Sequence, residues 1–286
     1  MTAALKYEWT RLVTLRSTWW LGGASIAVGA GFTFFMAMAL RLTSGSDIHG
    51  DLTERETSFY LNAAMTQFSN VDPMFYLLAY VVAILGILAW GHEYRHGMIR
   101  ATLTAVPQRW TVWVAKYVVV AGCVTAVVVT SCLLSLVFAL IWFSGLELDY
   151  DLGYLFLVIA KRILFTVLLT WLVMSVTVLI RHQTFSLVLL FLWPLGIETM
   201  IRLVLGVMVL VSGDEDVFGW ARFMPFNAGG RIIQQWGSTP GDDFGFQDNL
   251  TVFGDPMSAV GGFIIFGGLT FALMGLSLAM FQKRDA

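Results

Sequence analysis

Residues 112–143 read VWVAKYVVVAGCVTAVVVTSCLLSLVFALIWF, an apolar run in which Lys116 is the only charged residue. An α-helix rises about 1.5 Å per residue, so roughly 20 apolar residues cross the hydrocarbon core of a bilayer, which is about 30 Å thick. This run exceeds one span, and tilt or an extension into the interface takes up the excess. The run therefore predicts a transmembrane helix.

The composition of the whole chain agrees with a membrane protein. Of its 286 residues, 58% are apolar and only 13% are charged, about half the roughly 25% of charged residues in an ordinary soluble domain. We therefore expect an all-α membrane protein with six transmembrane helices. The six apolar runs lie near Trp19–Leu40, Pro73–Trp90, Val112–Phe143, Gly153–Ile180, Phe185–Leu210 and Ser258–Phe281.

The placement of Lys and Arg predicts the orientation of these runs. An even number of spans puts both termini on one side, and cytoplasmic loops carry the excess of basic residues. With the N-terminus inside, cytoplasmic segments hold three of the 19 acidic residues but 10 of the 17 basic ones. Those ten are Lys6, Arg11, Arg16, Arg95, Arg100, Arg109, Lys116, Arg181, Lys283 and Arg284. We expect both termini in the cytoplasm and a multi-pass protein of a bacterial-type cytoplasmic (inner) membrane.

The segment before the first span predicts a helix that lies along the membrane surface. Its apolar residues recur at helical spacing and form one face, with polar residues on the other. The apolar face consists of Leu5, Trp9, Leu12 and Val13. Such a helix rests in the interface of the inner leaflet. The alternative is that this segment simply extends the first span.

The cytoplasmic loop after the second span, GHEYRHGMIRATLTAVPQRW at residues 91–110, predicts a short helix. Gly97 and Pro107 punctuate the loop, and the residues between them carry few charges. A short helix of this kind indicates a partner surface.

The order of residues around this loop resembles the type-2 ATP-binding-cassette (ABC) permeases. Their pattern falls here on Glu93, Gly97, Ile99, Leu103, Pro107, Arg109 and Lys116. The segment FMPFNAGGRII, residues 223–233, resembles the family motif before the last span, and FQKRDA, residues 281–286, resembles the short basic tail. Met98 and Ala115 depart from the Thr and the Gly that are common in the family.

The resemblance implies a single transmembrane permease domain over residues 1–286. Residues 1–18 would form an elbow helix, 19–211 spans one to five, 212–257 an extracytoplasmic segment, and 258–286 span six with the basic tail. The loop helix would be a coupling helix on which cytoplasmic ABC ATPase subunits dock. Its expected residues are Glu93, Arg95, Gly97, Ile99, Arg100, Leu103, Pro107 and Arg109.

The resemblance further implies an exporter built from two permease chains, taken to be a homodimer, and two ATPase subunits in a lipid bilayer. The cargo stays open among drugs, peptides, lipids and glycans. No nucleic-acid partner is expected.

An ATP-binding loop is missing from the sequence. A Walker A loop requires G-x-x-x-x-G-K-[ST], and none of the four lysines follows a glycine. We therefore expect no enzyme activity, catalytic residue, metal or cofactor in this chain, with ATP and magnesium bound by the partner ATPase.

Four charged residues are expected at membrane depth, where each costs roughly 2.5–3.5 kcal/mol. They are Lys161 and Arg162 in the fourth run and Glu198 and Arg202 in the fifth. One interpretation is a polar lining of the translocation path beside a kink at Pro194. The other, which we slightly favour, places these charges in the headgroup region.

Two patterns of small residues concern helix packing. Gly23, Ala27 and Gly31 in the first span are equally compatible with dimer contacts and intrachain packing. For Gly268, Ala272, Gly275 and Ala279 in the sixth span we expect intrachain packing.

In the outer segment, NAGGRIIQQW at residues 227–236 predicts a short helix whose glycine pair marks its start.

Two other functions remain as alternatives. His92, Glu93 and His96 spell H-E-x-x-H, the spacing of an intramembrane zinc metalloprotease. Such a site needs a third protein ligand, and on the cytoplasmic side only Glu8, Asp285 and His182 remain as candidates. The second alternative is a membrane sensor or binding subunit that does not transport.

Overall fold

A computed structural model describes residues 2–43, 77–99, 102, 104, 108–144, 152–233 and 257–283. Within those ranges all regular structure is helical. Six helical stretches are long and apolar enough to cross a membrane. They are α2 (Arg16–Thr43), α4 (Leu77–Arg95), α6 (Arg109–Trp142), α7 (Leu152–Ile180), the composite fifth span (Gln183–Ser212) and α12 (Ala259–Lys283). The prediction of an all-α, multi-pass membrane protein is confirmed.

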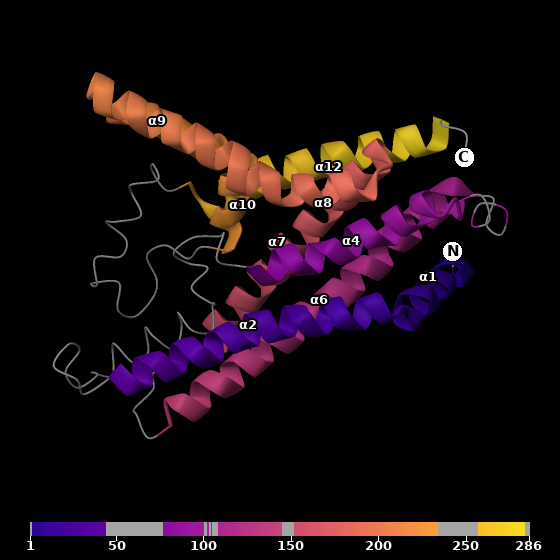
Figure 1. Cartoon of the computed structure of the whole chain (residues 1–286), viewed down its shortest axis with the longest axis horizontal. Helices are drawn as coiled ribbons and strands as arrows, with labels where there is room; N and C mark the ends of the chain where they lie inside the picture. Colours follow the sequence, from indigo (N-terminus) through magenta and orange to yellow (C-terminus); the bar gives the residue numbers. More distant parts are fainter. Residues whose placement is uncertain are drawn as a thin grey trace.

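Helix α4 is the most enclosed of the six spans. It packs against α2, α6, α7 and α8 (Gln183–Phe191), and 67% of its most apolar stretch is buried. Trp90 of α4 and Phe165 of α7 are among the largest fully buried side chains. Helix α1 (Thr2–Thr14) and the last turn of α12 lie at the same end of the bundle (Figure 1).

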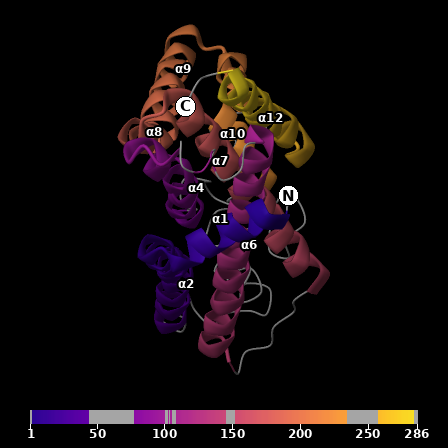
Figure 2. The ribbon, with the colours of Figure 1, turned by 90° about the vertical axis from the view of Figure 1, so that its right-hand side faces the viewer.

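Helix α1 is separate from α2, with the break at Leu15. It does not simply extend the first span; it lies across α6 in the view of that end of the bundle (Figure 2). Its buried residues are Ala4, Glu8 and Leu12. Of the predicted apolar face, Leu12 is buried against the bundle, whereas Trp9 and Val13 are exposed; the acidic Glu8 is turned inward.

The fifth span is broken where Pro194 predicts a kink. Helix α8 passes into a π-helix, η2 (Leu192–Glu198), and then into α9 (Thr199–Ser212). Proline lacks the N–H that an α-helix needs at this point, and wider π turns accommodate its ring. Only 6% of the span's most apolar stretch is buried, and α9 extends away from the bundle (Figure 1).

A compact helical unit follows this span. It consists of the 3-10 helix η3 (Glu215–Phe223) and helix α10 (Pro225–Ile233), which packs on α12 and α7. The predicted helix exists, but its glycine pair does not mark the start, because Pro225 begins the helix. A Cβ at Gly229 would lie 2.9 Å from Phe266 Cγ, so close packing against α12 is the reason for glycine there. Residues 234–236 of the predicted helix lie outside the described residues.

The small residues of α12 do not pack inside the chain as predicted. Gly268, Ala272, Gly275 and Ala279 are all exposed. The opposite face of α12, which includes Phe266, is buried toward its neighbours. In the first span, Gly23 and Ala27 are also exposed.

Candidate functional site

Four charged side chains from three helices meet at the end of the bundle where α1 lies. The ε-ammonium of Lys116 on α6 donates to Glu8 Oε1 and to Glu93 Oε1, each at 2.7 Å. Arg11 of α1 donates to Glu93 and lies 3.5 Å from Glu8 Oε2. Glu8 is 3% exposed, and Glu93 and Lys116 are fully buried. We call Glu8, Arg11, Glu93 and Lys116 the ion cluster.

The charges of the ion cluster balance one another. Two carboxylates face two cations, so no buried charge is left uncompensated, which is the costly case for a buried ion. Lys116 Nζ also lies 5.2 Å from the centroid of the Trp90 ring, within the range of a cation–π contact. The cluster thus fastens α1 to the end of α4 and the start of α6.

Residues 96–109, for which a coupling role was predicted and which we call the coupling segment, begin with a tight turn at the end of α4. Gly97 has φ +65°, the Met98 N–H donates to Glu93 O at 3.0 Å, and the Gly97 N–H donates to Tyr94 O at 3.5 Å. These bonds form a Schellman motif, in which the residue after the last helical turn is left-handed. Gly97 therefore ends α4 and turns the chain back over Glu93.

The residues after this turn return to the ion cluster. The Thr102 N–H and hydroxyl both donate to Met98 O, at 3.1 and 3.2 Å, and Ile99, Thr102 and Thr104 have helical backbone. The Thr102 hydroxyl lies 3.5 Å from Glu93 Oε1. One carboxylate thus contacts α1, α6 and the coupling segment.

Gly97→Ala is expected to destabilise the folded chain by about 1–2 kcal/mol, the cost of a left-handed conformation for a residue with a Cβ. A steric clash is not the reason for this loss, because no neighbouring atom lies within 4 Å of the Cβ that alanine adds. The measurement is the thermal unfolding midpoint of the purified chain. Gly122→Ala is the matched control: Gly122 is helical and equally open, so alanine there should be neutral or stabilising. Equal effects of the two substitutions would contradict the assignment.

The C-terminal turn of α12 is bonded to the first residue of α6. The Arg109 guanidinium donates to the carbonyls of Phe281 and Gln282, both at 3.3 Å. The rings of Trp90 and Phe281 meet edge to face, 5.2 Å between centroids. A cation at a helix C-terminus also interacts favourably with the helix dipole. Helices α1, α4, α6 and α12 are therefore joined at this end of the bundle.

The predicted coupling residues occupy different places. Glu93 is buried in the ion cluster, Ile99 is buried in the core, and Arg95 is exposed. Arg100, Leu103 and Pro107 lie outside the described residues. Among its described residues, the exposed ones are His96, Gly97, Met98, Thr104 and Gln108.

The partners of Glu93 were missed in the sequence. Glu8 was considered only as a candidate zinc ligand, Arg11 only among the cytoplasmic basic residues, and Lys116 as a family position without a partner. A signal was present: Glu8 is the only acidic residue among residues 2–43, and Lys116 is the only charge in residues 112–143. An isolated charge in an apolar helix requires a counter-charge.

The residues of the H-E-x-x-H motif lie at the end of α4. The ring centroids of His92 and His96 are 6.0 Å apart, and Glu93 is engaged by Lys116 and Arg11. His182 accepts a hydrogen bond from the Phe185 N–H at 3.1 Å and caps α8. In the part of the chain that the structure describes, no three His, Cys, Asp or Glu side chains are grouped to hold a metal ion.

Glu198 has a partner that neither interpretation of the sequence included. Its Oε1 accepts a hydrogen bond from the Phe226 N–H at 2.8 Å, and its Oε2 accepts one from the Asn227 N–H at 3.0 Å. The side chain is 1% exposed and attaches the fifth span to the first turn of α10. Lys161 on α7 and Arg202 on α9 are half-buried.

No protein-family model and no curated protein matches the sequence. The roles expected for Glu93 to Arg109 therefore stay predictions.

Proposed function

We propose that the chain is the membrane-spanning permease subunit of an ATP-driven ABC exporter. Two copies would pair as a homodimer and work with two cytoplasmic ATPase subunits. Hydrolysis of ATP by those subunits would drive export of a drug, peptide, lipid or glycan. Both termini would lie in the cytoplasm, on the inner side of a bacterial-type cytoplasmic membrane.

The ion cluster is the observation that carries this proposal. A docked ATPase would push on the exposed residues Arg95, His96 and Met98. The buried contacts of Glu93 with Arg11 and Lys116 join that surface to α1 and α6. Movement at the coupling segment would therefore displace helices rather than being absorbed by a flexible loop.

The surroundings of α1 support its role as an interfacial elbow helix. Trp9, Trp19 and Trp20 are exposed by 53%, 68% and 78%, and tryptophan is enriched where a membrane protein meets the headgroups. The neighbouring exposed charges, Lys6 and Arg16, are both basic, as expected on the cytoplasmic side.

Two surfaces support pairing with a second permease chain. The fifth span buries only 6% of its most apolar stretch, and the stripe of Gly268, Ala272, Gly275 and Ala279 on α12 is exposed. Small residues allow helix backbones to approach closely inside a bilayer. Lys161 and Arg202 remain candidates for the translocation path, whereas the contacts of Glu198 favour a structural role.

Met98→Asp is expected to reduce ATPase binding about tenfold or more, because it places a charge in the docking surface. Met98 is 45% exposed, so the substitution should not unfold the chain. The measurement is the amount of ATPase recovered with the affinity-tagged chain from membranes. Gln282→Asp is the control, since it adds the same charge at an exposed position on the same end of the bundle. Equal recovery with both variants would contradict the proposal.

The two alternatives give different results in the same preparation. A zinc metalloprotease would contain stoichiometric zinc that is lost in the His92→Ala, His96→Ala double variant. A sensor subunit would bind an ATPase without altering its hydrolysis rate and without moving cargo into inverted vesicles. No contact among the described residues favours either.

A further inference from the structure

The turn between α7 and α8 has an unusual backbone. It consists of Arg181 and His182, which we call the α7–α8 corner. Among the described residues, Arg181 is the only one other than glycine with a positive φ, 57°. A side chain with a Cβ disfavours this left-handed conformation. Neighbouring contacts must therefore hold the corner in place.

Both sides of the α7–α8 corner are bonded to helix ends. The Arg181 N–H donates to Thr177 O at 2.8 Å, at the end of α7. His182 begins α8: its Nδ1 accepts from the Phe185 N–H at 3.1 Å, and its carbonyl accepts from the Ser186 N–H at 3.1 Å. The backbone of the corner thus sets the direction in which α8 leaves α7.

The α7–α8 corner also contacts the last turns of α4. The guanidinium carbon of Arg181 lies 5.7 Å from the centroid of the Tyr94 ring, within the range of a cation–π contact. One turn earlier in α4, a Cβ at Gly91 would lie 2.8 Å from Gln183 Cγ. Glycine at this position allows the first residue of α8 to approach α4 closely. The fifth span therefore begins in direct contact with the end of α4.

Tyr94 connects this contact to the coupling segment. Its carbonyl accepts from the Gly97 N–H at 3.5 Å, in the turn that ends α4. Its ring stacks on Trp90, 6.1 Å between centroids, and Trp90 in turn contacts Lys116 of the ion cluster. A displacement at Gly97 therefore reaches Arg181 through a single residue.

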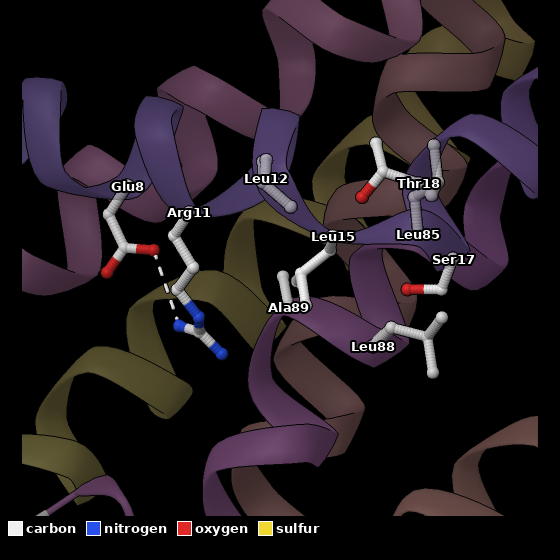
Figure 3. A pocket seen from close by; sticks show the side chains of 9 residues that line it. All are labelled: Glu8, Arg11, Leu12, Leu15, Ser17, Thr18, Leu85, Leu88 and Ala89. Atoms are coloured by element: carbon white, nitrogen blue, oxygen red, sulfur yellow. Dashed lines mark ion pairs between the residues drawn. The ribbon is translucent and has the colours of Figure 1, made fainter.

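The other side of α4 faces the first two helices. Figure 2 shows α4 between α8 and α2, and Figure 3 shows Arg11 of α1 and Ala89 of α4 beside the same small hollow. Glu93 bonds Arg11 on this side, whereas Tyr94, the next residue, contacts Arg181. The end of α4 thus has one connection to α1 and a separate one to the fifth span.

The direction of the fifth span depends on the second connection because little of the span is buried. Only 6% of its most apolar stretch is enclosed. Helix α8 packs on α4 and α7, whereas α9 extends away from the bundle (Figure 1). A rotation of α8 at the corner would therefore move the rest of the span.

We propose that Arg181 is a positioning residue that couples the end of α4 to the fifth span. A change in the turn at Gly97 moves Tyr94, and Arg181 transmits this movement to the first turn of α8. The proposal deepens the proposed function and rests on it only for the docked ATPase as the source of the movement. The connection itself belongs to this chain alone.

The experiment is hydrogen exchange, followed by mass spectrometry, of the full-length chain in lipid nanodiscs without an ATPase. Gly97→Ala perturbs the turn, because alanine disfavours the φ of +65° at this position. We expect exchange of α8 to accelerate at least about fivefold, within the coupling range of contacting residues. Exchange is normalised to α10, which reports any general loosening of the fold. Exchange of α1 should also accelerate, through Glu93.

Variants of Tyr94 separate transmission from simple loosening. In a Tyr94→Leu background, Gly97→Ala should change exchange of α8 by less than about twofold, as for independent sites, while α1 still responds. Tyr94→Phe is the matched control, because it keeps the ring that contacts Arg181 and should preserve the full response. Arg181→Gly is a second variant: it removes the guanidinium, tolerates the left-handed backbone, and should also abolish the response of α8.

Two results would overturn the proposal. One is an α8 that does not respond to Gly97→Ala in the parent chain while α1 does. The other is an equal response of α8 in the Tyr94→Leu and Tyr94→Phe backgrounds. Neither result bears on whether an ATPase docks, which Met98→Asp tests, so the two proposals can fail separately.

Discussion

Lys116→Met is expected to lower the free energy of unfolding by about 3–5 kcal/mol, the cost of leaving a buried ion without its partner. Lys116 is fully buried and bonds both Glu8 and Glu93. Methionine preserves the apolar stem but not the charge, so two carboxylates would share Arg11 alone. Chemical unfolding of the purified chain in mixed micelles measures the loss. Lys283→Met, at an exposed position, should change stability by less than about 0.5 kcal/mol.

A second substitution should restore much of this stability. In Lys116→Met, Glu93→Gln, the remaining charges are those of Arg11 and Glu8, which lie 3.5 Å apart and balance each other. Stability should therefore recover by about 2 kcal/mol or more, relative to Lys116→Met, since the uncompensated charge is gone. If the double variant is as unstable as the two single losses added together, the residues are not coupled and the ion cluster is wrong.

The double variant also separates folding from the proposed function. It restores charge balance but no longer bridges α4 to α6 through ionic bonds. We expect it to bind the ATPase through the exposed surface of the coupling segment while losing cargo-stimulated ATP hydrolysis. Normal coupling in this folded variant would contradict the role proposed for the ion cluster.

Glu198→Leu is expected to cost about 2–5 kcal/mol, because it leaves the buried N–H groups of Phe226 and Asn227 without an acceptor. The effect should be local, since these bonds attach η2 to the first turn of α10. Hydrogen exchange of residues 225–233 should therefore accelerate more than that of α4. Unfolding free energy and exchange rates are the two measurements.

Two comparison variants make this result specific. Glu198→Gln keeps one acceptor oxygen but presents an amide N–H₂ to the second backbone donor, so its effect should be intermediate. Met200→Ala lies two residues away and is 67% exposed; it should stay within about 0.5 kcal/mol of the parent chain. Rapid exchange of α10 in Met200→Ala would show that the whole region, rather than the Glu198 contact, is fragile.

Several features of the fold were predictable because they depend on neighbouring residues. The number of spans follows from the length of each apolar run. The break in the fifth span follows from the missing N–H of Pro194, and the end of α4 near Gly97 follows from the left-handed turn that glycine accommodates. Each of these causes acts within one or two helical turns.

Which face of each transmembrane helix packs against the rest of the chain was less predictable from the sequence. The stripe at Gly268, Ala272, Gly275 and Ala279 was expected inside the chain and lies outside. In water, apolar residues mark the inner face of a helix, but in a bilayer the lipid tails are as apolar as the protein interior. Periodicity of apolar residues therefore does not say which face of a span meets protein.

The sequence by itself determined that this is an all-helical membrane protein with six spans, and where two of its helices break or end. Only the tertiary structure decided that Glu8 meets Lys116 across 108 residues of chain, that Arg11 meets Glu93 across 82, and that Glu198 holds α10. The physical reason is that helix formation in a bilayer is set by local hydrogen bonds and apolar length. The partner of a buried charge, by contrast, is set by how the finished helices pack.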